Sequence, residues 1–181
     1  FHEIEKNEVF ESLLGKKITL TNKNAVFSLN NEVVNLAGVI GGKGTSCSAN
    51  TKTVIVECAF FQPEAIIGKS IKYDIQSEAS HKFERGVDPK CHDMVLRRFI
   101  KLVSEHTNIK DMSMISYNYK DNTNLKIPVN VHKINQIIGI NISEKDYLIY
   151  LSKLGFLIEE GFIKVPSFRS DIRTQNDLAE E

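Results

Sequence analysis

The sequence predicts an α+β fold, with a first domain over residues 1–120 and a small α+β module over residues 126–181. Three observations support this class. Residues 16–61 are rich in strand-type patterns, residues 90–106 have the periodicity of an amphipathic helix, and both patterns recur in shorter form after residue 125. The polar stretch KDNTN separates the two parts, so we place the domain boundary there.

The composition is that of an ordinary globular chain and excludes several classes. Lys+Arg and Asp+Glu both number 23, so a nucleic-acid contact would need a local basic patch. Cys47, Cys58 and Cys91 have neither disulfide-framework nor metal-ligand spacing, which favours a reducing, cytoplasmic setting. We expect no signal peptide and no membrane span. Because the chain begins at Phe1 rather than methionine, we expect a fragment of a longer protein.

Strands are expected first along the chain. KKITLT and AVFSL alternate around NKN, which predicts a β-hairpin. TVIVECAFF (53–61) is apolar on both faces and predicts a central buried strand. Between these segments, GVIGGKGTSCS supplies glycines that permit positive φ and close backbone approach.

Helices follow. Gln62-Pro63 predicts a helix start that continues through EAIIGKSIKY. The segment 90–106 predicts a longer helix, because Val95, Phe99, Leu102 and Val103 share one face. DMSMISYNY (111–119) then predicts a short strand.

The small module is predicted from clear start and stop signals. VHKINQIIG and SEKDYLIYLSKLG each predict a helix. In the second of these, Ser143 with Asp146 resembles a capping box, and Gly155 fits the position just after the helix end. FLIEEGFIKVP predicts a β-hairpin that turns at Glu160-Gly161.

Four stretches in order carry a family resemblance: GVIGG (38–42), VECAFFQPEAI (56–66), SEASHKFERGVDP (77–89) and VPSFRSDIRTQNDLAEE (165–181). Together they resemble the beta subunit of bacterial phenylalanyl-tRNA synthetase. The resemblance implies a mixed-sheet editing domain with packed helices over residues 1–120, and the start of the following module over residues 126–181.

The resemblance also implies an activity and partners. In this family the beta subunit joins the alpha subunit in a heterotetramer of two alpha and two beta chains that binds tRNA(Phe). Aminoacylation with ATP belongs to the alpha subunit, while the editing domain hydrolyses tyrosine wrongly esterified to tRNA(Phe). The expected editing ligand is therefore tyrosine. We expect no DNA partner and no membrane partner.

Glu57 is the candidate selectivity residue. It lies mid-segment in VIVECAFF, where a charge is costly unless it has a partner. A carboxylate there would accept a hydrogen bond from the tyrosine hydroxyl and would be left unpaired by phenylalanine, at a cost of at least ~1–3 kcal/mol. The matching family position contacts that hydroxyl. The alternative is a structural ion pair, for example with Arg85.

The remaining pocket candidates follow from the same resemblance. Gly41 matches a pocket glycine whose missing Cβ allows close approach, Ala79 matches a small lining residue, and Ser77 stands where the family often has threonine. Their alternatives are a plain turn for Gly41 and simple packing for Ala79. His2 matches the histidine of the editing site and could orient a water or act as a base. Its alternative is a surface histidine.

The rest of SEASHKFERGVDP is expected to support the pocket rather than to catalyse. Phe83 would anchor it, Arg85 and Asp88 would be internal electrostatic ties, and Gly86 would allow a turn. We expect His81 to be structural or at the surface.

Four acids near the end of the chain form a second constellation: Asp171, Asp177, Glu180 and Glu181. The last three share a helix face and could offer oxygen ligands to Mg²⁺. The resemblance implies a magnesium site at these positions, shared with the alpha subunit, although we do not expect it to be occupied in this fragment. The alternative is favourable acids in a first helical turn.

Two other functions are compatible with the residues. The chain could be a non-catalytic scaffold that docks tRNA and the alpha subunit. It could also be a free-standing amino-acid-binding protein, although the C-terminal motif argues against that reading.

Overall fold

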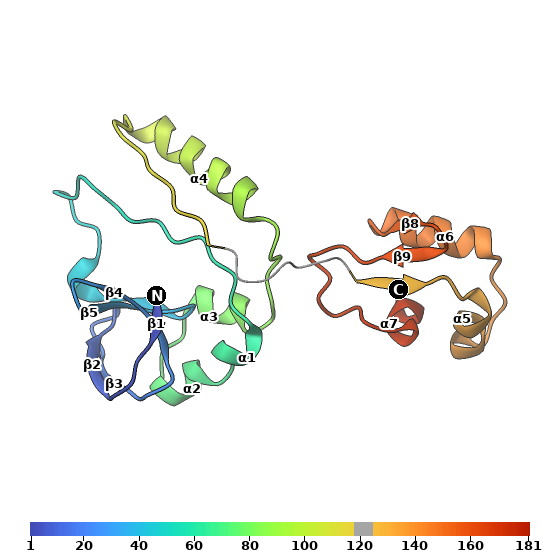
Figure 1. Ribbon diagram of the computed structural model, residues 1–181, viewed down its shortest axis with the longest axis horizontal. Coiled ribbons are helices and arrows are strands. Elements are labelled where there is room, and N and C mark those ends of the chain that lie inside the picture. Colours follow the sequence, from blue (N-terminus) through green and yellow to red (C-terminus); the bar gives the residue numbers. More distant parts are fainter. Residues whose placement is uncertain (118–124) are drawn as a thin grey trace. The chain divides into compact units, whose positions relative to one another are not determined.

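The computed structural model describes residues 1–117 and 125–181 (Figure 1). It contains two compact units, Phe1–Val87 and Asp88–Glu181, each with helices and antiparallel sheets. The α+β class is therefore confirmed. The predicted boundary segment KDNTN lies outside the described residues, so its position remains a prediction.

The first unit is built on two antiparallel sheets. The larger has the order β1-β4-β5-β6 and the smaller pairs β2 with β3. The strands are β1 (His2–Glu3), β2 (Glu8–Glu11), β3 (Lys17–Leu20), β4 (Ala25–Leu29), β5 (Glu32–Leu36) and β6 (Ile40–Gly41). A short 3₁₀ turn, η1 (Lys43–Thr45), follows β6.

The predicted hairpin between KKITLT and AVFSL is wrong in its pairing. β3 pairs with β2, whereas β4 pairs with β1 and β5. The turn between β3 and β4 does not join these two strands into a hairpin. Instead, the backbones of Lys23 and Asn24 hydrogen-bond to the backbone of Ile4, and these bonds place β4 beside β1. The actual hairpin joins β4 to β5 through Asn30 and Asn31, both at positive φ, which asparagine tolerates.

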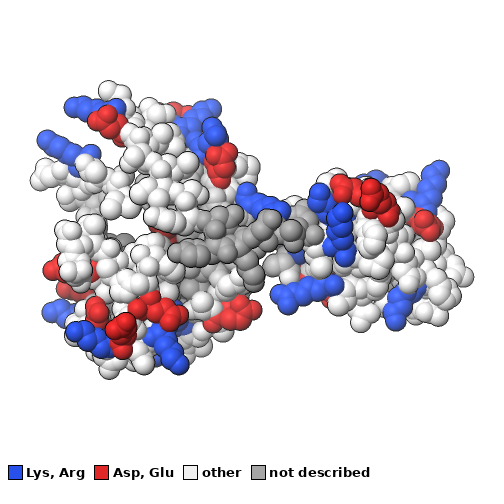
Figure 2. Space-filling model, viewed as in Figure 1, with Lys and Arg blue, Asp and Glu red and all other residues white. Residues whose placement is uncertain are grey.

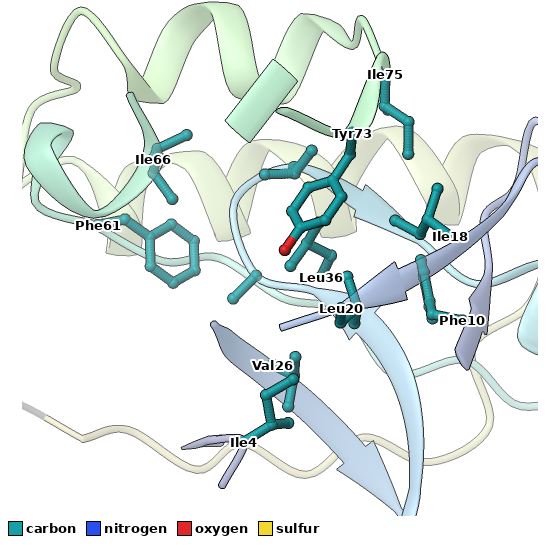
Figure 3. Packing of buried hydrophobic residues seen from close by; sticks show 12 residues of the cluster. Ile4, Phe10, Ile18, Leu20, Val26, Leu36, Phe61, Ile66, Tyr73 and Ile75 are labelled. Atoms are coloured by element: carbon teal, nitrogen blue, oxygen red, sulfur yellow. The ribbon is translucent and has the colours of Figure 1, made fainter. Parts of the chain in front are cut away.

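The core of the first unit lies between its sheets and three short helices: α1 (Pro63–Ile66), α2 (Lys69–Tyr73) and α3 (Glu78–Phe83). Ile66 and Tyr73 from the helices and Leu20 and Leu36 from the strands belong to one buried cluster (Figure 3). The Tyr73 hydroxyl accepts a hydrogen bond of 2.7 Å from the amide of the buried Asn24, so these two polar groups are paired inside the core. The helix predicted from Gln62 is interrupted at Gly68, whose φ of +81° ends α1 and starts α2.

Two predicted strands are not formed. Residues 53–61 have no strand pairing, and Val54 and Ile55 are 55% and 84% exposed. Of the predicted strand at 111–119, the described residues 111–117 also form none. At β6 the outer edge of the sheet is already engaged by a bridge between Gly42 and Ser12, so segment 53–61 does not pair there.

The second unit contains the predicted long helix, α4 (His92–His106). Beyond the undescribed segment it has a three-stranded sheet, order β7-β9-β8, with three helices. These elements are β7 (Lys126–Pro128), α5 (Val131–Ile138), α6 (Glu144–Lys153), β8 (Leu157–Glu159), β9 (Phe162–Lys164) and α7 (Gln175–Glu180).

The start and stop signals of this unit are confirmed. Ser143 caps α6 by accepting a hydrogen bond from the Asp146 amide, and Gly155 has the positive φ expected after the helix. The β8–β9 hairpin turns at Glu160 and Gly161, with φ of 51° and 79°. In the described part of the chain, no helix is long and apolar enough to cross a membrane.

Candidate functional site

Two of the predicted pocket residues, Gly41 and Glu57, come together through Asn35. In the sheet, Asn35 on β5 pairs with Phe27 on β4 and with Gly41 on β6. Directly paired residues point to the same face, so these three form a row on the face opposite the buried Val26 and Leu36. The Asn35 amide Nδ2 donates a hydrogen bond of 3.2 Å to Glu57 Oε2. The Glu57 carboxylate is thereby placed beside this row.

The setting of Glu57 differs from the expected buried strand. Glu57 belongs to the extended segment 53–61, which makes no ladder bonds, and the residue as a whole is exposed. Neighbouring atoms nevertheless remove part of the water around its carboxylate, and this desolvation raises the pKa of Glu57. The alternative ion pair with Arg85 is not formed, because the Arg85 guanidinium bonds to the ring and carbonyl of His81.

Gly41 has open space above it. A Cβ at Gly41 would meet no atom within 4 Å, whereas a Cβ at the neighbouring Gly42 would lie 3.0 Å from the Val34 carbonyl oxygen. Packing therefore explains why Gly42 is glycine but does not explain Gly41. An open backbone position beside a carboxylate leaves room for a guest molecule.

Ser77 and Ala79 are placed differently from Glu57. The Ser77 hydroxyl caps α3 by accepting from the Ser80 amide and donates a 2.5 Å hydrogen bond to the Val39 carbonyl. Its single proton is therefore committed to tying α3 to the loop before β6. Ala79 lies on α3 and is exposed. The structure thus gives Ser77 a supporting role and does not join Ala79 to the Glu57 row.

His2 does not share the face of Asn35. Its strand position pairs with Val26, one residue before Phe27, so its side chain belongs to the opposite face. The His2 Nε2 atom lies 2.9 Å from the Ser28 hydroxyl, and the ring is exposed. The arrangement does not join His2 to Glu57, and its role in orienting a water or acting as a base stays a prediction.

A series of contacting aromatic rings begins at Phe27, and the sequence analysis predicted a role for only one of its four members, Phe83. Phe27 shares the face of Asn35, and the Phe1 ring lies 5.0 Å from it between centroids. Phe61 lies 6.1 Å from Phe1 and packs edge-on against Phe83 at 4.9 Å. Phe83 therefore acts as the anchor expected of it. The alternation in AVFSL indicated that Phe27 faces away from Val26, but the partner strand was not identified.

Two family models match the chain. Residues 2–108, more than half of the chain, match the family model of the B3/4 domain. The chain belongs to the B3/4 domain family. Residues 127–181 match the tRNA synthetase B5 domain.

Curated relatives agree with both matches. Over 96% of its length the chain is 33% identical to the phenylalanine–tRNA ligase beta subunit of Methylococcus capsulatus, and over 98% it is 32% identical to that of Protochlamydia amoebophila. It is 30% identical over its whole length to that of Ehrlichia canis. The resemblance found from the motifs is confirmed. The chain spans 23–24% of the length of these relatives.

In the part that matches the B5 domain, three of the four predicted metal ligands are already engaged, and the fourth, Glu180, is the last residue of α7. Arg169 binds Asp171, with Nη2 and Oδ2 2.6 Å apart, and also forms a two-pronged ion pair with Glu181. Asp177 accepts hydrogen bonds from the backbone of Arg173 and Thr174 and closes the capping box of α7. Only Asp177 lies in a first helical turn, the place that the alternative gave to these acids, whereas Asp171 and Glu181 are ion-pair partners of Arg169.

The same residues do not fit a magnesium ion as they are arranged. Across residues 1–117 and 125–181, no three His, Cys, Asp or Glu groups converge as a metal site. Arg169 already supplies positive charge to two of the four carboxylates. A cation would have to displace this guanidinium, and so the magnesium expectation remains a prediction without support from the geometry.

The Arg169 cluster predicts acid sensitivity of the second unit. The hydrogen bonds from Arg169 lower the pKa of Asp171 below 3.8 and that of Glu181 below 4.5. A lowered folded-state pKa stabilises the fold fully above these ordinary values, and this stabilisation is lost as the pH falls through the lower folded values. We expect thermal unfolding of the second unit to shift downward in that acid range. Arg169→Met should flatten the shift, and an unchanged profile in that variant would contradict the assignment.

Proposed function

We propose that the chain is part of a phenylalanine–tRNA ligase beta subunit and that its first domain hydrolyses tyrosine wrongly esterified to tRNA(Phe). The alpha subunit of that enzyme would attach phenylalanine with ATP. The family match supports the placement in this enzyme. The observation that carries the editing proposal is the Glu57 carboxylate, held by Asn35 beside the open backbone of Gly41 and the ring of Phe27.

Selectivity would arise as the guest covers Glu57. A tyrosine ring placed over the row removes water from the carboxylate and returns a hydrogen bond from its hydroxyl. A phenylalanine ring removes the same water and returns nothing. The uncompensated carboxylate costs about 1–3 kcal/mol or more, which corresponds to roughly one to two orders of magnitude in binding. Because Glu57 is exposed in the free chain, its carboxylate loses water only when a guest binds, and the cost of leaving it unpaired arises only at that point.

Hydrolysis would use a positioned water rather than a covalent intermediate. The aminoacyl ester is an activated substrate, and correct placement of a water supplies a large part of the rate enhancement. Because His2 lies on the other face of the sheet, we propose that the terminal hydroxyl of the tRNA orients this water.

The test uses the complete alpha–beta enzyme with Tyr-tRNA and Phe-tRNA. The parent enzyme should release tyrosine and spare phenylalanine, and Glu57→Ala should lose this preference. Glu64→Ala, which removes an exposed acid on α1, is the matched control and should behave as the parent. Unchanged clearance of Tyr-tRNA by Glu57→Ala, with Phe-tRNA still spared, would refute the proposal.

A docking role is the second candidate, and α4 favours it. Val95, Phe99 and Leu102 on this helix are each 41–43% exposed, and no residue of α4 is buried. An apolar helical face of this kind is typical of contact with another part of an assembly. On the face shown in Figure 2, acidic and basic side chains are interspersed, which does not favour a broad phosphate-binding surface. Tyrosine release by the complete enzyme but not by the 181-residue chain would favour a module that depends on such docking.

A further inference from the structure

The side-chain amide of Asn35 has one buried oxygen without a hydrogen-bond partner in the described part of the chain. Asn35 sits on β5, an interior strand of the four-stranded sheet, with Phe27 and Gly41 on either side. Its Nδ2 donates to Glu57, but its Oδ1 is buried and has no hydrogen-bond partner in the described part of the chain. Buried acceptors are almost always paired in folded proteins, so an orphaned one calls for a reason.

The orientation of the amide explains why the orphan persists. An ionised carboxylate only accepts hydrogen bonds, so Glu57 requires the NH₂ end of Asn35. Turning the amide would place Oδ1 against the carboxylate and would lose the bond. The contact with Glu57 therefore fixes the amide and leaves Oδ1 without a donor.

Stability alone does not account for asparagine at this position. Asparagine is disfavoured in strands, and a β-branched residue would suit the site better without leaving any polar atom unpaired. Asn24 provides the contrast within the same unit. Its amide donates to the Thr21 carbonyl and to the Tyr73 hydroxyl, both at 2.7 Å, so it contributes to the core.

We propose that Asn35 is a positioning residue that holds the Glu57 carboxylate in place over the Phe27–Asn35–Gly41 row, ready to accept the hydroxyl of a bound tyrosyl group. This inference rests on the proposed editing function. Without Asn35, Glu57 would extend into water from an unpaired segment and would have to be ordered by the guest itself. Asn35 thus converts a mobile surface acid into a pre-oriented acceptor.

The test separates this role from a structural one by the sign of the stability change. In the 181-residue chain, Asn35→Val should keep or raise the midpoint of chemical unfolding, whereas Asn24→Ala should lower it. In the same Asn35→Val variant, the preference for L-tyrosinamide over L-phenylalaninamide, measured by calorimetry, should fall about tenfold. Asn35→Asp, which keeps the shape but replaces the donor with an acceptor, should also lose the preference.

A spectroscopic measurement adds an independent reading. Loss of the Asn35 donor should raise the pKa of Glu57, because hydrogen bonds to the charged form of a carboxylate favour its ionisation. Carbon NMR of the Glu57 carboxylate would measure this pKa. Asn31→Asp, in the exposed β4–β5 turn, is the matched control and should change neither the preference nor this pKa.

The outcomes distinguish the inference from the function it rests on. If the parent chain prefers tyrosinamide and Glu57→Gln removes the preference, but Asn35→Val retains it, only the role of Asn35 is overturned. If the parent chain shows no preference, the inference and the editing proposal for this chain fall together. Destabilisation by Asn35→Val with an unchanged tyrosinamide preference would assign Asn35 to the fold alone.

Discussion

Gly38→Ala should destabilise the first unit by about 2–5 kcal/mol. Gly38 has φ of +69°, a region that costs an L-residue about 1–2 kcal/mol. An added Cβ would also lie 2.6 Å from Ile66 Cδ1 and 2.9 Å from Phe61 Cδ2, both in buried side chains. Overpacking of this kind adds about 1–3 kcal/mol. Urea unfolding of the parent and the variant would measure the loss.

Gly41→Ala is the matched control from the same GVIGG motif. A Cβ at Gly41 meets nothing within 4 Å, and this residue does not have positive φ, so the midpoint of unfolding should stay within experimental error or rise slightly. The same variant should weaken the binding of tyrosinamide if the guest approaches the Gly41 backbone, because the added methyl group would occupy that space. Equal destabilisation by the two substitutions would contradict the distinction between a packing glycine and a site glycine.

Local signals in the sequence predicted the elements after residue 125 well. Ser143, Gly155 and the Glu160-Gly161 turn specify backbone conformations within a few residues of themselves, and each is found as expected. Such caps and turns depend little on distant contacts, so a single sequence is sufficient to place them.

Long-range pairing was not predictable in the same way. The apolar segment 53–61 has the composition of a buried strand, but composition does not say whether a sheet edge is free. The edge of β6 is taken by Ser12, and β4 is drawn to β1 by backbone bonds with Ile4. The motifs predicted Glu57 and Gly41 as site residues. Asn35, which joins them, could not be predicted, because its position between Phe27 and Gly41 depends on the register of β5.

Phe156→Ala should destabilise the second unit by about 3–5 kcal/mol and leave the first unit unchanged. Phe156 is 1% exposed and belongs to a cluster confined to residues 127–179. The cluster of the first unit is confined to residues 4–83, so the two cores share no residue. Removing the ring therefore opens a cavity in one core only. Hydrogen exchange, which reports each core separately, would measure both effects.

Leu157→Ala is the control for this substitution, because the neighbouring Leu157 is 57% exposed and its loss opens no cavity. We expect that variant to change the stability of the second unit by well under 1 kcal/mol, the usual range for surface substitutions. If Phe156→Ala also released the slowly exchanging amides of β4 and β5, the two units would unfold as one cooperative body. If Phe156→Ala lowers the stability of the second unit alone, the stability of the Glu57 site depends only on the packing of residues 4–83.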